Sequence, residues 1–163
     1  MQTCHVRPAV AADALVSTAV LRGSIALLCA ADHANDPATL DQWLRNKTET
    51  AFLQWLADPR NFLVVAELDA TVRGVGLIRA SGQVRLCYVE PGFQHRGIGR
   101  ALLQSLEARA LQWGSAEVRL QSSVGACAFY ERHGYASSGP PEQAFGVVTA
   151  YPYAKDVRGL TSR

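Results

Sequence analysis

Hydrophobic and polar positions change their period near the middle of the chain. Apolar residues alternate with other residues from Val84 to Tyr88, which is the two-residue period of a β-strand. Pro91 and Gly92 end this strand, because proline has no N–H group for the ladder and glycine favours a turn. From Ile98 the apolar positions take the helical period, and Gly114 stands where a helix C-cap glycine is expected. The strand is expected to place Val84, Leu86 and Tyr88 on one face and Arg85 and Cys87 on the other, and the helical stripe comprises Ile98, Leu102, Leu106, Ala110 and Trp113.

The N-terminal half predicts one short strand followed by several helices. Pro8 closes a strand over Cys4–Arg7, and Asp13 is expected to cap a helix over Ala14–Arg22. Gly23-Ser24 is expected to interrupt that helix before a second apolar stretch. The remaining predicted helices are Ile25–Ala31, one begun by the N-cap Asp36 and the N1 proline Pro37 and carrying Leu40, Trp43 and Leu44, and Glu49–Ala57 capped by Thr48.

Three strands follow in a predicted antiparallel meander. Phe62–Glu67 is almost continuously apolar, which is typical of a central strand covered on both faces. Thr71–Ala80 carries Gly74 and Gly76, which are expected to weaken this strand or to bulge it. The third strand is the one that starts at Val84. Later in the chain the pattern predicts a strand over Glu117–Gln121, a helix capped by Ser122 or Ser123, a strand over Tyr135–Ser138 and a last strand over Gly146–Lys155.

Composition and charge narrow the class of protein. A chain of 163 residues with 48% hydrophobic and 18% charged residues is expected to form one domain over residues 1–163. A net charge of +2 argues against general nucleic-acid binding, which requires a clustered basic face. The four cysteines show no metal-ligand spacing, and the apolar stretch Ile25–Ala31 is too short to cross a bilayer. No signal peptide precedes the first strand, so we expect a cytoplasmic protein with no metal, no membrane partner and no nucleic-acid partner, and a homodimer is left open.

The loop between the strand from Val84 and its helix has features of a phosphate site. Gly97 and Gly99 let the backbone approach a ligand, and the first helical N–H groups point into that space without intrahelical partners. The helix dipole and the cations Arg96 and Arg100 favour an anion there. On spacing alone, a plain turn with capping glycines is the alternative. A dinucleotide-type G-x-G-x-x-G and a P-loop do not fit, because Leu102 occupies the third glycine position and no Gly-Lys-Ser/Thr follows.

Two motifs resemble the GNAT superfamily of acyl-CoA N-acyltransferases. Gln94-x-x-Gly97-x-Gly99, after a strand ending in Val-x-Pro and before an apolar helix, is similar to the acetyl-CoA signature of that family. Ala126-x-x-Phe129-Tyr130, followed by Gly134-Tyr135, is similar to a second family motif. The resemblance implies a single-domain α/β GNAT acyltransferase fold, with a central, mostly antiparallel mixed sheet flanked by helices. It also implies that the strand from Val84 and the strand Glu117–Gln121 splay apart to admit the acyl-CoA arm.

The resemblance implies roles toward acetyl-CoA for individual residues. The main chain of Cys87, Tyr88 and Val89 is expected to pair with the pantetheine arm as a strand would. Ser123 stands where the family usually has Asn, so a hydroxyl would replace an amide contact to that arm. The pyrophosphate loop is expected to act mainly through backbone N–H groups, and it comprises Gln94, His95, Arg96, Gly97, Ile98, Gly99 and Arg100. Ala126, Phe129 and Tyr130 complete the implied cofactor site.

Tyr130 is the implied general acid, because the matching tyrosine of the family faces the thioester sulfur. A phenol with a pKa of about 10 can protonate a departing thiolate whose conjugate acid has a pKa of about 8.5. On spacing alone, Tyr130 and Phe129 indicate an aromatic anchor in the core. The N–H of Val89 is the implied oxyanion donor. No general base for the amine is assigned. Some family members have Glu early in the strand, where this chain has Gln83 and Arg85. The alternatives are Glu67, Glu90, His33 and a relay of waters.

A polar cluster between two apolar helices is the predicted acceptor side. In the family this helical region lines the acceptor site, and here it carries Asp32, His33 and Asp36 together with Trp43 and Trp55. A carboxylate pair would suit a cationic amine, whereas helix caps and core tryptophans are the alternative. The sequence therefore predicts an acetyl-CoA-dependent N-acetyltransferase in which an amine of unknown identity attacks directly. A non-catalytic acyl-CoA-binding or regulatory module on the same fold is the competing hypothesis.

Overall fold

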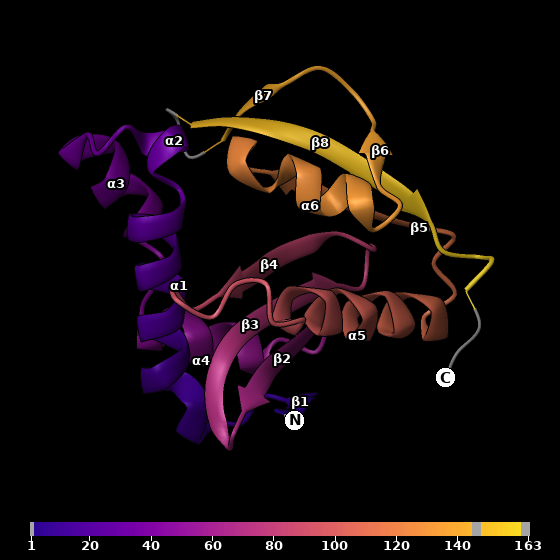
Figure 1. Ribbon diagram of the computed structural model, residues 1–163. Helices are drawn as coiled ribbons and strands as arrows, with labels where there is room; N and C mark the ends of the chain where they lie inside the picture. Colours follow the sequence, from indigo (N-terminus) through magenta and orange to yellow (C-terminus); the bar gives the residue numbers. More distant parts are fainter. Residues whose placement is uncertain (1, 145–147, 161–163) are drawn as a thin grey trace.

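Two antiparallel sheets form the centre of the fold in the computed structural model, which describes residues 2–144 and 148–160. The first sheet has the strand order β1-β2-β3-β4 and comprises β1 (Cys4–Pro8), β2 (Asn61–Leu68), β3 (Thr71–Arg79) and β4 (Val84–Val89). The second has the order β5-β8-β6, with β7 also paired to β8, and comprises β5 (Glu117–Ser122), β6 (Ala136–Ser137), β7 (Glu142–Ala144) and β8 (Val148–Asp156). Figure 1 shows β8 and α6 above, and β2–β4 and α5 below. The predicted meander and the mostly antiparallel α/β architecture are confirmed.

Helices cover both faces of the first sheet (Figure 1). One core cluster joins α5 to the face of β2 that carries Val64 and Ala66, and another joins α1 and α4 to the face that carries Leu63 and Val65. The prediction of a central strand covered on both faces is therefore confirmed. The helices are α1 (Ala14–Leu28), α2 (Ala30–His33), α3 (Pro37–Leu44), α4 (Glu49–Ala57), α5 (Ile98–Gln112) and α6 (Cys127–Arg132), with 3₁₀ turns at Ala11–Asp13 and Val124–Ala126.

The two glycines of β3 let α5 lie close to the sheet. A Cβ atom on Gly74 would come within 2.7 Å of the Ile98 side chain, and one on Gly76 would come within 3.1 Å of Val64. The register of β2 against β3 also shifts beside Gly74, leaving Arg73 as the extra residue of a bulge. The expectation of a bulge is met there, but the main reason for the glycines is the close approach of the helix.

The first long helix begins at Ala14 as predicted, but it extends beyond Arg22 and is not capped as predicted. It runs without a break through Gly23 to Leu28, because Leu21 and Ile25 continue one buried stripe across the glycine. A helical glycine costs only about 1 kcal/mol relative to alanine, which such packing outweighs. Asp13 does not cap this helix with its side chain; its carboxylate instead accepts hydrogen bonds from the Val10 N–H at 2.8 Å and from both terminal nitrogens of Arg7.

A bulge in β4 overturns the predicted faces of that strand. Leu77 of β3 pairs with Leu86, but the next residue, Ile78, pairs with Val84, so Arg85 is an extra residue. Val84 therefore joins the α5 cluster, while Leu86 joins the α1 and α4 cluster. An unbroken two-residue period had placed these two side chains on one face, and it misses a bulge because a bulge inserts one position into the alternation.

The C-terminal strands differ from their predicted spans. β6 is shorter than its predicted span, β7 was not predicted, and β8 runs to Asp156, while Gly146 of the predicted last strand lies outside the described residues.

The segment Ala11–Leu28, which includes α1, is long and apolar enough to cross a membrane, by length and composition alone. It is longer than Ile25–Ala31, the apolar stretch considered from the sequence. Because α1 packs its buried face on the sheet, the pattern is also that of a core helix.

Removing the ammonium of Lys155 is expected to destabilise the fold. Glu107, 4% exposed, accepts a hydrogen bond from the Tyr135 hydroxyl at 3.0 Å and pairs with Lys155 Nζ at 2.9 Å. Lys155→Met would leave a buried carboxylate without its cation, which costs about 3 kcal/mol or more. Urea unfolding measures this loss. Arg158→Met, which breaks an exposed pair with Asp156, is the control and should cost less than about 1 kcal/mol; equal losses would contradict this account of Glu107.

Candidate active site

The site lies where β4 and β5 separate. The two strands meet at a parallel bridge between Gln83 and Arg119, where the Arg119 N–H also donates to the Gly82 carbonyl at 3.0 Å. Beyond this point β4 pairs with β3 and β5 pairs with β8, so the strands splay as the family resemblance implied. A cleft of about 270 Å³ opens between them. Its walls comprise Gln83 to Tyr88 of β4, Leu120 to Ser122 of β5, Ser123, Trp43, Tyr130, Ala144 and Val148 to Ala150 of β8.

The C-terminal half of β4 directs backbone N–H groups toward the cleft. The Glu90 N–H donates to Arg73 O of the neighbouring β3 segment at 2.8 Å. Because N–H groups alternate in direction along a strand, those of Val89 and Cys87 face the opposite edge, on the side of β5. This edge can pair with an extended ligand, and Val89 holds an N–H group in the position expected for an oxyanion donor.

The loop before α5 presents a row of backbone donors. Its left-handed residues His95 (φ 63°) and Gly97 (φ 82°) turn the chain so that Gly97 becomes the N-cap of α5. Within the described part of the chain, the N–H groups of residues 94–97 donate no hydrogen bond of ordinary geometry to another backbone group, and the first N–H groups of α5 have no intrahelical acceptor. Together with the positive end of the helix dipole, these groups form a concave anion site.

Glycine is needed at Gly97 and at Gly99 for two different reasons. A Cβ atom on Gly97 would meet nothing within 4 Å, so this glycine is required by its positive φ and borders open space. A Cβ atom on Gly99 would lie 3.1 Å from the Phe129 ring. Gly99 therefore lets α6 pack against the start of α5, whereas the sequence had assigned both glycines to ligand approach.

Side chains of the loop shape it and add positive charge. Gln94 accepts the Gly92 N–H at 2.8 Å through its own Oε1 and so fixes the turn. Arg96 lies over the Phe93 ring at 5.0 Å. The Arg100 side chain is exposed at the helix start, and it contributes, after burial, to lowering the pKa of His133. The potential near α5 therefore favours a phosphate group.

Tyr130 stands in the cleft wall with its ring held on two sides. It is 7% exposed and makes edge-to-face contacts with Phe129 (5.1 Å between centroids) and Tyr135 (5.7 Å). Its hydroxyl interacts with the Cys87 thiol across the strand–helix interface. Burial raises the pKa of Tyr130 well above its ordinary value, so the hydroxyl is protonated at neutral pH.

Cys87 shows what this environment does to a sulfur anion. Burial raises the pKa of its thiol to about 12, and the hydrogen bond with Tyr130 acts in the opposite direction by favouring the thiolate. The Cys87 thiol therefore stays protonated at neutral pH, and its neighbour across the interface is the Tyr130 hydroxyl. The side chain of Cys87 itself packs in the α5 core cluster.

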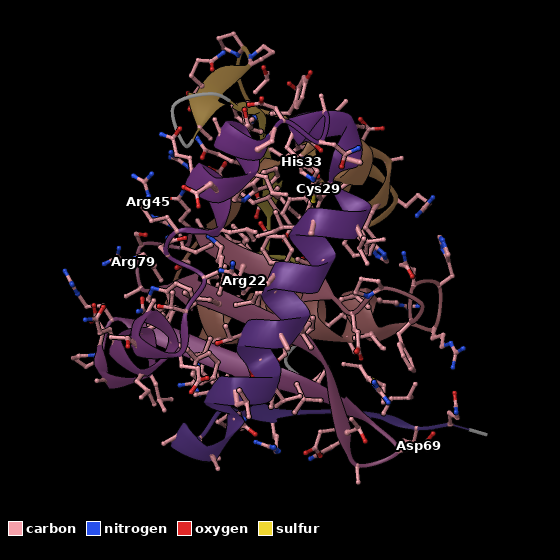
Figure 2. All side chains as sticks on the ribbon, turned by 90° about the vertical axis from the view of Figure 1, so that its left-hand side faces the viewer. Arg22, Cys29, His33, Arg45, Asp69 and Arg79 are labelled. Carbon is pink, nitrogen blue, oxygen red and sulfur yellow. The ribbon has the colours of Figure 1, made fainter. Side chains whose placement is uncertain are left out.

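The predicted acceptor residues of α2 do not line this cleft. His33 is 1% exposed, its Nε2 donates to the Ile25 carbonyl at 2.9 Å and its Nδ1 accepts from the Asn35 N–H at 3.0 Å, next to Cys29 at the end of α1 (Figure 2). Asp36 caps α3 through the Thr39 N–H. These contacts favour the structural alternative for His33 and Asp36, and direct binding of an acceptor by His33 stays a prediction without support from its position.

Asp32 supplies the cap that the serines were predicted to supply. Its Oδ1 accepts the Val124 N–H at 2.8 Å, at the start of the 3₁₀ turn that carries Ala126 and leads into α6. Neither serine side chain caps the helix: Ser122 Oγ donates to the Ser123 carbonyl, and Ser123 lines the cleft. Burial raises the pKa of the Asp32 carboxyl, partly opposed by the Val124 bond. Asp32 thus orients the helix of Tyr130 from a distant part of the chain.

Removal of this cap is expected to loosen α6. Asp32→Ala should lower the free energy of unfolding by about 1 kcal/mol, since it removes the acceptor for the Val124 N–H. Asp32→Asn keeps an oxygen acceptor and should lose clearly less. Thermal unfolding of the two variants measures the difference, and equal losses would show that the carboxylate charge, not the cap, matters.

Sequence reasoning missed the cleft residues that come from β5 and β8. Gln121, Thr149 and Val148 reach the cleft through the pairing of strands far apart in the chain, for which no local pattern exists. Arg85 was noted only as the residue at a position where some family members have a carboxylate. Among the described residues no aspartate or glutamate lines the cleft, so the structure does not identify a base there.

The chain belongs to the acetyltransferase (GNAT) domain family, whose sequence model matches residues 29–157. It is 33% identical over 116 residues to an IAA acetyltransferase of Azospirillum brasilense, covering 66% of this chain and 70% of that protein. It is 30% identical over 101 residues to an uncharacterised N-acetyltransferase of Mycobacterium tuberculosis, covering 58% of this chain. The match spans 65% of the length of that mycobacterial relative.

Solved structures share the fold across almost the whole chain. A GCN5-related N-acetyltransferase of Rhodopseudomonas palustris aligns with a TM-score of 0.84 at 23% identity, covering 96% of this chain and 97% of that one. The PaiA N-acetyltransferase of Thermoplasma acidophilum, solved in complex with coenzyme A, aligns with a TM-score of 0.77 at 20% identity, covering 94% and 99%. These likenesses establish the GNAT fold.

Proposed function

We propose that this chain transfers an acetyl group from acetyl-CoA to an amine held in the cleft between β4 and β5. The observation that carries the proposal is the Tyr130 hydroxyl, which faces a sulfur in a dry wall of the cleft. The anion site of residues 94–100 lies at the start of the helix that packs on the same wall. The complex of the Thermoplasma neighbour with coenzyme A supports the choice of donor.

The open edge of β4 is proposed to hold the donor. Pyrophosphate oxygens would accept hydrogen bonds from the N–H groups of the loop, and the pantetheine amides would pair with Cys87 and Val89. The Val89 N–H would then lie beside the thioester carbonyl, where it stabilises the oxygen as negative charge develops. The residues present therefore fit an acyl-CoA without further side-chain ligands.

The proposed reaction is a direct displacement. The neutral amine attacks the thioester carbonyl, an N–C bond forms, and the C–S bond breaks as the amide carbonyl is restored. Tyr130 gives its proton to the departing CoA sulfur, and the proton that the attacking nitrogen loses as the amide forms passes to solvent, from which Tyr130 recovers one. The proton lost by the incoming ammonium goes to water, since the described cleft wall offers no carboxylate to take it.

A thiol-release assay tests the proposal. The protein is mixed with acetyl-CoA and a panel of amines, including amino acids, aminoglycosides, polyamines and peptides, and free CoA is followed with a thiol reagent. We expect release that depends on one class of amine and exceeds hydrolysis without amine. Calorimetric titration with acetyl-CoA runs in parallel. Tight binding with no amine-dependent release from any member of the panel would contradict catalysis and favour an acyl-CoA-binding module.

A further inference from the structure

The bulge in β4 brings a cation into the acceptor end of the cleft. Arg85 is the extra residue of that bulge, and it is the charged residue among those that line the cleft in the described part of the chain. Bulges next to a site commonly re-aim a side chain. Arg85 also lines a second, smaller cavity of about 90 Å³ on the α4 side of β4, so it lies between the two.

The second cavity is rich in positive charge. Besides Arg85 its wall includes Lys47 and Arg79, together with the polar side chains of Asn46 and Asn61. Lys47 is 2% exposed, and its Nζ donates to Asn46 Oδ1 at 2.5 Å. Three cationic side chains thus border one cavity.

The fold fixes this cationic group in place. Arg22 of α1 donates to the carbonyls of Leu44 and Lys47 at 3.0 and 3.1 Å, which pins the loop that carries Lys47. Figure 2 shows Arg22, Arg45 and Arg79 on the same side of the molecule, beside α1. The backbone at Lys47 is therefore tied to α1.

Acidic side chains do not line either cavity in the described part of the chain. Asp58 lies near Arg79 but is engaged by Arg60, whose Nη2 is 2.8 Å from its Oδ2. Glu67 pairs with Arg7 on the far edge of the sheet. A polycationic acceptor would thus meet like charge at this end of the cleft, whereas an oxyanion would meet Arg85 in the cleft wall, with Lys47 and Arg79 beyond it in the second cavity.

We infer that the acceptor is a small amine that also carries an oxyanion group, such as a carboxylate, and that Arg85 with Lys47 and Arg79 binds this group. The inference rests on the proposed function and names the class of its acceptor. Arg85 and Cys87 are two positions apart on β4, roughly 7 Å along a strand. That span suits a molecule whose amine points toward the Tyr130 wall while its oxyanion reaches Arg85.

Matched pairs of acceptors test the inference. L-amino acids are compared with their carboxamides, which keep the same amine and lose the negative charge, and aminoalkylphosphonates are included as a second oxyanion. Thiol-release kinetics should give kcat/KM at least tenfold higher for the acids than for the amides. The relative kcat/KM of carboxylate and phosphonate acceptors shows which class of oxyanion the site prefers.

Variants of Arg85 assign the effect to this residue. Arg85→Gln should raise KM for the acids by tenfold or more, with little change in kcat and little effect on the amides, and Arg85→Lys should restore part of the loss. Arg45→Gln, which removes an exposed arginine paired with Asp41, is the control and should change nothing. Equal losses on acids and amides would show that Arg85 is only structural, and would overturn the inference.

Binding gives a second readout that needs no turnover. Burial lowers the pKa of Lys47 to about 8, with Arg85 as a further cause. A bound oxyanion would raise that pKa, so titration of the acids at pH 8 in two buffers should show more proton uptake in the unchanged protein than in Lys47→Gln, a difference from which protonation of the ligand's own amine cancels. Transfer to amides or polycationic amines but not to acids would overturn this inference and leave the proposed function standing, whereas no transfer to any amine would remove both.

Discussion

Tyr130→Phe is expected to lower kcat by roughly 10²–10⁴-fold while leaving the fold and the binding of acetyl-CoA intact. The ring keeps its contacts with Phe129 and Tyr135, so only the hydroxyl beside the Cys87 sulfur is lost. Without that hydroxyl the departing CoA thiolate must leave unprotonated or take a proton from solvent. Steady-state kinetics with a true acceptor measures the loss.

Two controls separate acid catalysis from packing. Tyr135→Phe makes the same substitution on the neighbouring ring, whose hydroxyl binds Glu107 instead of facing the cleft, and it should keep kcat while lowering stability. A thioester whose thiol has a lower pKa needs less help in leaving, so it should recover part of the Tyr130→Phe loss. Near-normal kcat in Tyr130→Phe would mean that solvent protonates the thiolate and that Tyr130 is a packing residue.

Gly97→Asp is expected to weaken acetyl-CoA binding at least tenfold, about 1.4 kcal/mol. Gly97 borders open space at the N-terminus of α5, so an added carboxylate would point into the anion site and repel a phosphate. Aspartate tolerates positive φ better than most residues, which keeps the backbone cost small. Calorimetric titration with acetyl-CoA measures the change.

Gly97→Asn is the matched control, because it has nearly the same size and the same backbone strain without the charge. Its affinity for acetyl-CoA should lie close to that of the unchanged protein. Raising the salt concentration should reduce the difference in affinity between Gly97→Asp and Gly97→Asn. Equal weakening by Asn and Asp would indicate that bulk or strain, rather than an anion site, sets the effect. Gly99 is less suitable, since a side chain there would press on Phe129.

Local patterns predicted most elements of the fold, because each depends on neighbours in sequence. The strand Phe62–Glu67, the caps at Asp36 and Thr48 and the start of α5 at Ile98 all follow from periodicity and capping chemistry. The family motifs then added the splay of β4 from β5. The interruption expected at Gly23 failed because buried neighbours outweigh a single weak helix former.

The acceptor end could not be predicted because it depends on contacts between distant segments. Asp32 was taken for a substrate residue, yet it binds the Val124 N–H, 92 residues further along the chain. The bulge that exposes Arg85 to both cavities arises from the register of β3 against β4, which the alternation of β4 alone does not record. The loop and the open strand edge predicted for the donor are present in the structure, whereas Asp32 and His33, predicted for the acceptor, make structural contacts instead.

The most direct test of acetyl transfer in this cleft is a single-turnover experiment with isotope-labelled acetyl-CoA and an accepted amine, read by mass spectrometry of both the small molecules and the protein. The account predicts that the label moves to the amine nitrogen in one step, that no labelled protein accumulates, and that Tyr130→Phe slows this step. Label found first on a protein side chain such as Cys87, or released only as acetate, would contradict it.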